Sequence, residues 1–176
     1  MKEAGMLVKR RKKFKVTTDS NLAKPLFDNL LNRDFASKAA DQTYAHDIGY
    51  IWTQEGWLYL VTVIYLYSRR AVGWSMCSRI AAQLVCDALR IAIWQRRSKA
   101  VLIVHSDRGS EYVSNAYCPL LKSHDFVGSK GTCWDNAVAE SFFASLKQAR
   151  VQWRNYQTRN EAQQDVMNYI TMWHSS

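Results

Sequence analysis

The chain contains Val104-His105-Ser106-Asp107-Arg108-Gly109-Ser110-Glu111-Tyr112 at the end of a short apolar run, residues 100–104. The run predicts a buried strand that ends in a polar turn. In α/β proteins, polar residues at the carboxyl end of such a strand are often functional rather than structural. Asp107 is therefore the first candidate functional residue, provided that other parts of the chain supply partners for it.

The pattern around this strand predicts an α/β fold with a mixed sheet. The expected strands cover residues 44–53, 57–67, 71–77, 100–104 and 126–127. The expected helices cover residues 80–97, 114–124, 135–153 and 158–173, and a loop is expected over 128–131. Short turns between the first three strands indicate an antiparallel meander. The succession matches a ribonuclease-H-like fold, with three antiparallel strands, then two parallel strands, and helices on both faces of the sheet.

Length and composition predict one cytosolic domain. With 176 residues, of which 48% are hydrophobic, the chain can form a substantial core. It has no apolar run of about 18 residues that could cross a membrane, and the charged N-terminus lacks a signal peptide's apolar segment. We therefore expect a cytoplasmic protein. The four cysteines lack zinc-ligand spacing, so we expect no zinc.

Positive charge is concentrated at the N-terminus of a chain whose formal net charge is +9. Residues 1–15 hold seven Lys or Arg side chains and one Glu. Such a run is most often a solvated tail, but in a basic protein it favours a polyanionic partner, because each neutralised phosphate releases a counterion. We expect residues 1–43 to form a basic arm or linker and 44–176 to form the core. The candidate DNA-binding cations of the arm are Lys9, Arg10, Arg11, Lys12 and Lys13.

Two further carboxylates could act with Asp107. Asp47 lies inside the first expected strand, with apolar residues on both sides, where an unpaired buried carboxylate would be costly. Glu140 lies on the 135–153 helix among alanine, valine and phenylalanine side chains, whereas most helical glutamates are solvated. Lys147 follows Glu140 by two helical turns on the same face.

Three converging carboxylates would raise one another's pKa unless divalent cations kept them ionised. A ligand set made only of oxygen atoms favours Mg²⁺ or Mn²⁺ over zinc. A pair of such ions can stabilise both the attacking and the leaving oxygen in a phosphodiester displacement. Fold order, carboxylates and basic charge therefore all indicate chemistry on nucleic acid.

Several long motifs in order resemble the integrase catalytic core of bacterial insertion-sequence transposases, the retroviral-integrase-like enzymes with an Asp-Asp-Glu triad. The resemblance covers about residues 10–173. Its motifs are DIGYI (47–51), EGWLYL (55–60), SRRAVGW (68–74), HSDRGSEY (105–112) and GTCWDNAVAESFFASLK (131–147).

The resemblance implies that Asp47, Asp107 and Glu140 bind two Mg²⁺ or Mn²⁺ ions and are catalytic. It implies that Lys147 contacts DNA phosphate, and we add Arg108 to the candidate DNA-binding residues. The implied reaction is metal-dependent cleavage of double-stranded DNA at an element end, followed by attack of the freed 3′-hydroxyl on target DNA. Such polynucleotidyl transfer needs no nucleotide cofactor. The family also implies a homo-oligomer on DNA, a bacterial protein located at the nucleoid when bound to DNA, and no membrane partner.

The sequence also departs from the family. Tyr65 stands where relatives usually carry aspartate. Gly49 stands where they usually carry threonine, and a glycine inside a strand weakens that strand. The loop at 127–131 is shorter, and the chain ends before the family's basic tail, as expected of a truncated copy. These departures leave open a catalytically silent relative that only binds DNA or a partner transposase. A nuclease acting on RNA–DNA hybrids is a weaker alternative that the fold alone allows.

Overall fold

The computed structural model describes residues 43–96, 102–106, 110–130 and 137–175. Some sequence-based predictions lie outside these residues: the basic arm with its cations, residue 97 of the first expected helix, the 100–101 start of the fourth strand, the roles of Asp107 and Arg108, residue 131 of the expected loop, and the 135–136 start of the third expected helix. Asp47, Glu140 and Lys147 lie within the described residues.

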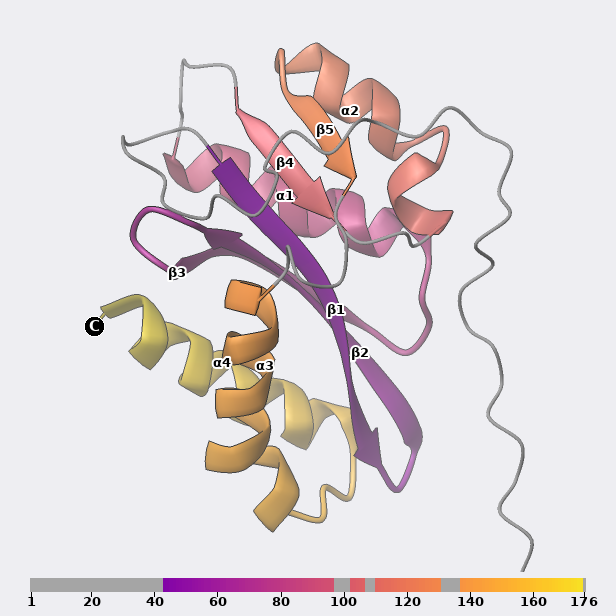
Figure 1. The fold of residues 1–176 in the computed structure, drawn as a ribbon. Coiled ribbons are helices and arrows are strands. Elements are labelled where there is room, and N and C mark those ends of the chain that lie inside the picture. Colours follow the sequence, from indigo (N-terminus) through magenta and orange to yellow (C-terminus); the bar gives the residue numbers. More distant parts are fainter. Residues whose placement is uncertain (1–42, 97–101, 107–109, 131–136, 176) are drawn as a thin grey trace, which may run out of the picture.

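Five strands form one sheet in the order β3-β2-β1-β4-β5 (Figure 1). The strands are β1 (Thr43–Thr53), β2 (Gly56–Tyr65), β3 (Arg70–Cys77), β4 (Ile103–Ser106) and β5 (Val127–Lys130). β1, β2 and β3 are antiparallel, whereas β4 is parallel to both β1 and β5. The predicted mixed sheet, with three antiparallel and two parallel strands, is confirmed.

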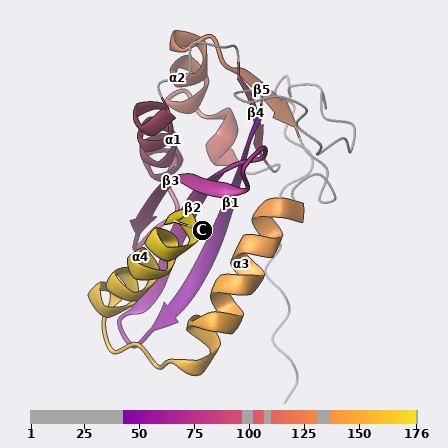
Figure 2. The same cartoon turned by 90° about the vertical axis from the view of Figure 1, so that its left-hand side faces the viewer.

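Helices cover both faces of the sheet: α1 and α2 pack on one face, and α3 and α4 pack on the other. Figure 2 shows α1 and α3 on opposite sides of the strands. The α-helices are α1 (Ala82–Arg96), α2 (Tyr117–Ser123), α3 (Ala137–Ala149) and α4 (Arg159–Ser175). Short 3₁₀ helices cover Ser110–Val113 and Val151–Trp153. Each helical layer buries its own hydrophobic core, one beneath α1 and one beneath α3 and α4. None of the described helices has the length and apolar character of a membrane span.

The fourth and fifth strands end later than predicted. β4 continues through His105 and Ser106. β5 includes residues 128–130, which we predicted to belong to a loop over 128–131. The two strands pair in parallel from Ile103 with Val127 to Ser106 with Lys130. This pairing satisfies the backbone of the polar segment, so the strand forms without the apolar pattern by which strands are predicted.

Two predicted helices are also shorter in the structure. The helix expected over 114–124 is preceded by a 3₁₀ turn and begins at Tyr117, so that Pro119 lies in its first turn, where a missing N–H is tolerated. The helix expected over 135–153 ends at Ala149, because Arg150 leaves the helical conformation with φ −131°. The chain then turns back, so that the backbone carbonyl of Tyr156 accepts a hydrogen bond from Gln54 at the end of β1.

Candidate active site

Asp47 lies two residues beyond Ala45, the last described residue of β1 that pairs with β4. Among the described residues, β4 pairs with β1 only from Thr43 to Ala45, and the later residues of β1 have no described partner in β4. Asp47 is half-buried, and its Oδ1 accepts a hydrogen bond of 2.8 Å from the backbone N–H of Ile48. The strand alternation places Asp47 on the same face as Gly49, which is the face that α3 covers.

Glu140 reaches the same region from α3. It lies in the first turn of that helix, where a negative charge is favourable to the helix dipole. Its side chain is exposed, so the apolar surroundings predicted from the sequence lie beside it rather than enclose it. Phe143 and Lys147 follow at intervals of three and seven residues and therefore lie along the same helical face.

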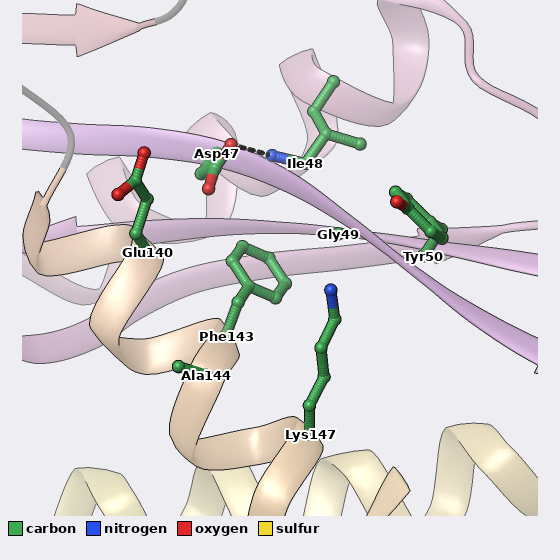
Figure 3. Close-up of a pocket in the computed structure, with 8 residues that line it drawn as sticks. All are labelled: Asp47, Ile48, Gly49, Tyr50, Glu140, Phe143, Ala144 and Lys147. Atoms are coloured by element: carbon green, nitrogen blue, oxygen red, sulfur yellow. Dashed lines mark hydrogen bonds between the residues drawn. The ribbon is translucent and has the colours of Figure 1, made fainter. Parts of the chain in front are cut away.

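Asp47 and Glu140 line one open pocket of about 330 Å³, together with Lys147 (Figure 3). Its full lining comprises Asp47, Ile48, Gly49 and Tyr50 of β1 and Glu140, Phe143, Ala144 and Lys147 of α3. Two carboxylates and one ammonium group therefore gather where α3 crosses β1.

The pocket depends on close contact between Gly49 and Phe143. A Cβ atom at residue 49 would overlap the Phe143 ring, which points from α3 onto β1 (Figure 3). Phe143 is buried in the core beneath α3 and α4, and its ring packs edge-on against Phe142 at 5.5 Å between centroids. The glycine that we interpreted as a weakness of the strand therefore allows α3 to approach β1 and carry Glu140 toward Asp47.

Lys147 contributes a cation to the same pocket. Its Nζ lies 5.0 Å from the ring centroid of Tyr50, within the range of a cation–π interaction. The contact orients the ammonium group along the edge of β1, two helical turns from Glu140. This position is open to an anionic ligand because the lysine side chain is exposed.

His46, next to Asp47, is an uncharged neighbour. Burial lowers the pKa of His46 from 6.5 to about 3, so the ring is neutral at physiological pH. The ring packs edge-on against Tyr112 and Tyr117 on the opposite face of the sheet from α3. The positive charge beside Asp47 in the described part of the site therefore comes from Lys147, not from the adjacent histidine.

Oxygen donors of the pocket suit a hard divalent cation, although the described residues contain only two of the three predicted ligands. Among these residues, no group of three or more His, Cys, Asp and Glu side chains could hold a metal ion. Asp47 and Glu140 supply two carboxylates to one pocket, and the third predicted ligand, Asp107, lies outside the described residues. Carboxylate oxygens fit Mg²⁺ or Mn²⁺ and do not favour zinc.

Tyr50 and Phe143 also line the site, although the sequence did not lead us to predict a role for either. The signal for Phe143 was its spacing of three residues from Glu140 and four from Lys147, which places all three on one helical face. For Tyr50, the sequence pattern indicates only a position within a strand. Its proximity to Lys147 depends on how α3 crosses β1, which no local pattern records.

Comparison with known proteins identifies the family. The family model "Integrase core domain" matches residues 37–160, most of the chain. The chain belongs to this family. The predicted integrase catalytic core is thereby confirmed.

Curated relatives place this integrase core beside insertion-sequence transposases, as expected. The transposase InsF of insertion sequence IS3A from Escherichia coli (strain K12) is 43% identical over 173 residues, covering 97% of this chain and 60% of the relative. The IS600 uncharacterized 31 kDa protein of Shigella sonnei is 37% identical, covering 99% of this chain and 65% of the relative. The integrase core described here thus spans about 60% of the length of the curated InsF proteins.

Solved structures confirm the ribonuclease-H-like integrase fold. The catalytic domain of Mos1 mariner transposase has a TM-score of 0.64 at 11% identity, with 81% of this chain and 76% of that chain covered. The HTLV-2 integrase catalytic core, solved with magnesium, has a TM-score of 0.53 at 14% identity, with 62% and 69% covered. A Mos1 catalytic domain structure also contains Mn. Related cores therefore bind Mg²⁺ or Mn²⁺.

Proposed function

We propose that this integrase core cuts and joins DNA strands in transposition, using Asp47, Asp107 and Glu140 to hold divalent metal ions. The observation that carries the proposal is the convergence of Asp47 and Glu140 on one pocket in a chain of the integrase core family. The register of β4 adds support, because Ala45 pairs with His105, and the described strand ends one residue before Asp107.

The three carboxylates would fix the position of the reacting phosphodiester through the ions that they hold. Mg²⁺ or Mn²⁺ bound there would activate a nucleophile and stabilise charge on the leaving oxygen. Asp47 is well suited to this role because its strand is anchored in the sheet and its Oδ1 is oriented by the N–H of Ile48. Glu140 would complete the ligand set from α3, whose position is fixed by Phe143 packing on Gly49.

Lys147 would bind a DNA phosphate beside the reacting group. Its ammonium group lines the pocket, and the Tyr50 ring limits where it can point. Arg108 and the N-terminal cations Lys9, Arg10, Arg11, Lys12 and Lys13 would extend the contact along the DNA backbone, since the chain carries a formal charge of +9. Bringing two DNA ends together would require a homo-oligomer on double-stranded DNA.

A strand-nicking assay tests the proposal. The substrate is a labelled duplex carrying the end of the insertion sequence that encodes this chain, in the presence of Mg²⁺ or EDTA. We expect nicking only with Mg²⁺, and a loss of about 100-fold or more in Asp107→Asn and Asp47→Asn, because metal-assisted charge stabilisation contributes several kcal/mol. Asp125→Asn is the matched control: Asp125 is exposed, and its φ of 55° is one that asparagine also tolerates.

Equal nicking by the wild type and Asp107→Asn would overturn the proposal. Metal-independent binding to the duplex without any nicking would instead indicate a silent relative that only binds DNA. Preferential cleavage of an RNA–DNA hybrid of the same sequence would indicate a hybrid nuclease.

A further inference from the structure

Three aromatic side chains form an exposed patch next to the candidate active site. Tyr50 and Trp52 lie on β1, and Trp57 lies on β2, where it pairs across the strands with Trp52. Their exposed fractions are 55%, 52% and 42%, which is unusual for side chains of this size. We call these three residues the aromatic patch.

The patch is held in a fixed geometry. The Trp57 ring packs edge-on against Trp52 at 4.8 Å and against Tyr50 at 5.4 Å between centroids. The underlying hairpin is anchored by Arg159 of α4, whose Nε donates a hydrogen bond of 3.1 Å to the carbonyl of Trp57. Rings held in this way can bind a planar ligand with little further loss of conformational entropy.

Tyr50 belongs both to the patch and to the pocket, so the two surfaces are continuous. It lines the pocket with Asp47 and Glu140, and Lys147 Nζ lies 5.0 Å from its ring centroid. A ligand on the patch therefore meets a cation at the end nearer the carboxylates. Aromatic faces beside an ammonium group can bind a ligand that links planar groups to anionic groups. Nucleic acid is such a ligand, because its planar bases are linked to anionic phosphates.

We propose that the aromatic patch stacks unpaired DNA bases close to the reacting phosphate while Lys147 contacts the backbone between them. This inference rests on the proposed DNA substrate. With about 3.4 Å per strand residue, Tyr50 and Trp52 lie roughly 10 and 17 Å along β1 from Asp47. At about 3.4 Å per nucleotide, the stacked bases lie about three to five nucleotides from the site of reaction. Paired bases offer no free faces there, so the patch selects a locally opened strand.

The size of the patch argues against a second copy of the chain as its occupant. Large aromatic side chains bury roughly 150–250 Å² each, so three half-exposed rings present on the order of 300 Å². A stable protein partner needs about 800 Å² from each side. One or two bases need far less, and the adjacent Lys147 matches their phosphates in charge.

Binding of a fluorescein-labelled oligothymidylate of about 20 nucleotides tests the proposal by anisotropy, in EDTA and with the full chain. We expect Trp52→Leu to weaken this binding about 5- to 100-fold, whereas Trp52→Phe, which keeps a ring, stays close to wild type. For a duplex of the same length, Trp52→Leu should weaken binding by less than about threefold, because the bases of a duplex are already stacked on one another. Trp94→Leu on α1 is the control, since Trp94 is 70% exposed and not part of the patch.

A second measurement guards against misfolding of the variant. In the wild type, photocrosslinking with an oligonucleotide that carries 5-iodouracil should label a peptide containing residues 50–57. Crosslinks confined to other peptides, or a Trp52→Leu chain that binds the oligothymidylate like wild type, would overturn the inference. Loss of self-association with unchanged oligonucleotide binding would also overturn it and assign the patch to a second copy. Because this binding is measured without metal, its failure is separate from failure of nicking by Asp107→Asn.

Discussion

At the scale of single residues, the pocket depends on the absence of a side chain at Gly49. Gly49 lacks a Cβ, and the ring of Phe143 fills the space where a Cβ would lie. Glu140 and Lys147 flank Phe143 on the same helical face, so the contact sets the distance of both from β1. Adding a methyl group at residue 49 should therefore change the position of α3 in the pocket, although no charged residue is substituted.

Gly49→Ala should destabilise the protein by about 1–3 kcal/mol, because the methyl group overlaps the Phe143 ring. Elsewhere in a strand the same substitution would be neutral or stabilising, since it reduces the entropy of the unfolded chain. Phe143→Leu alone should also destabilise by opening a cavity, but the double variant should lose less than the sum of the single losses. Urea unfolding of the four proteins measures this coupling; additive losses would contradict the contact.

The residues of the site could be predicted in part. Asp47, Glu140 and Lys147 were found from the motifs and from helical spacing, and the structure brings all three to one pocket. The role of Gly49 could not be predicted, because a glycine in a strand has the same local pattern whether it is a defect or a point of close approach. Only the crossing of α3 over β1 distinguishes the two.

At the scale of elements, the segment after α3 connects three parts of the fold. The hydroxyl of Tyr156 donates a hydrogen bond of 2.8 Å to the buried carboxylate of Asp165 on α4. Arg150 and Arg154 approach the other oxygen of Asp165 at 3.6 and 3.3 Å. Tyr156 also bridges to Thr53 at the end of β1. Burial and the adjacent carboxylate raise the pKa of the Tyr156 hydroxyl, so it remains a donor.

Removing the Tyr156 hydroxyl tests this connection. Tyr156→Phe should destabilise the protein by about 1–2 kcal/mol, because Asp165 loses one buried hydrogen bond but keeps its arginine partners. Asp165→Ala should cost more, about 2–4 kcal/mol, since it also leaves two arginines and the buried hydroxyl without their acceptor. Thermal unfolding ranks the two variants; an Asp165→Ala chain as stable as Tyr156→Phe would contradict the network.

The elements were predicted best where side-chain periodicity is strong. The meander and α1 follow from apolar patterns. The fifth strand was predicted only over 126–127, because the polar residues that follow in β5 reveal nothing of their pairing with β4. Likewise, helical propensity extends past Ala149, but the chain leaves the helix where Arg150 meets Asp165 of α4. Strand pairing and ion pairs between residues far apart in the sequence cannot be predicted from the pattern of a short segment.

At the scale of the whole molecule, the sheet order places the candidate site on β1, the central strand of the sheet, where α3 crosses it. Among the described residues, β4 pairs with β1 only as far as Ala45, and the following residues of β1, Asp47 to Tyr50, line the pocket with α3. The mixed sheet of three antiparallel and two parallel strands was predicted from the succession of elements, and the structure adds the strand order β3-β2-β1-β4-β5. The continuity of the pocket with the aromatic patch was not, because it combines residues from both faces of β1.

Binding of Mn²⁺ to the full chain, followed by isothermal titration calorimetry, tests the central claim most directly. The account predicts that the wild type and Asp125→Asn bind Mn²⁺ equally, while Asp47→Asn and Glu140→Gln each bind at least about tenfold more weakly, because each removes a charged oxygen ligand. A Glu140→Gln chain that binds Mn²⁺ with wild-type affinity would contradict the claim that the pocket between β1 and α3 is the metal site.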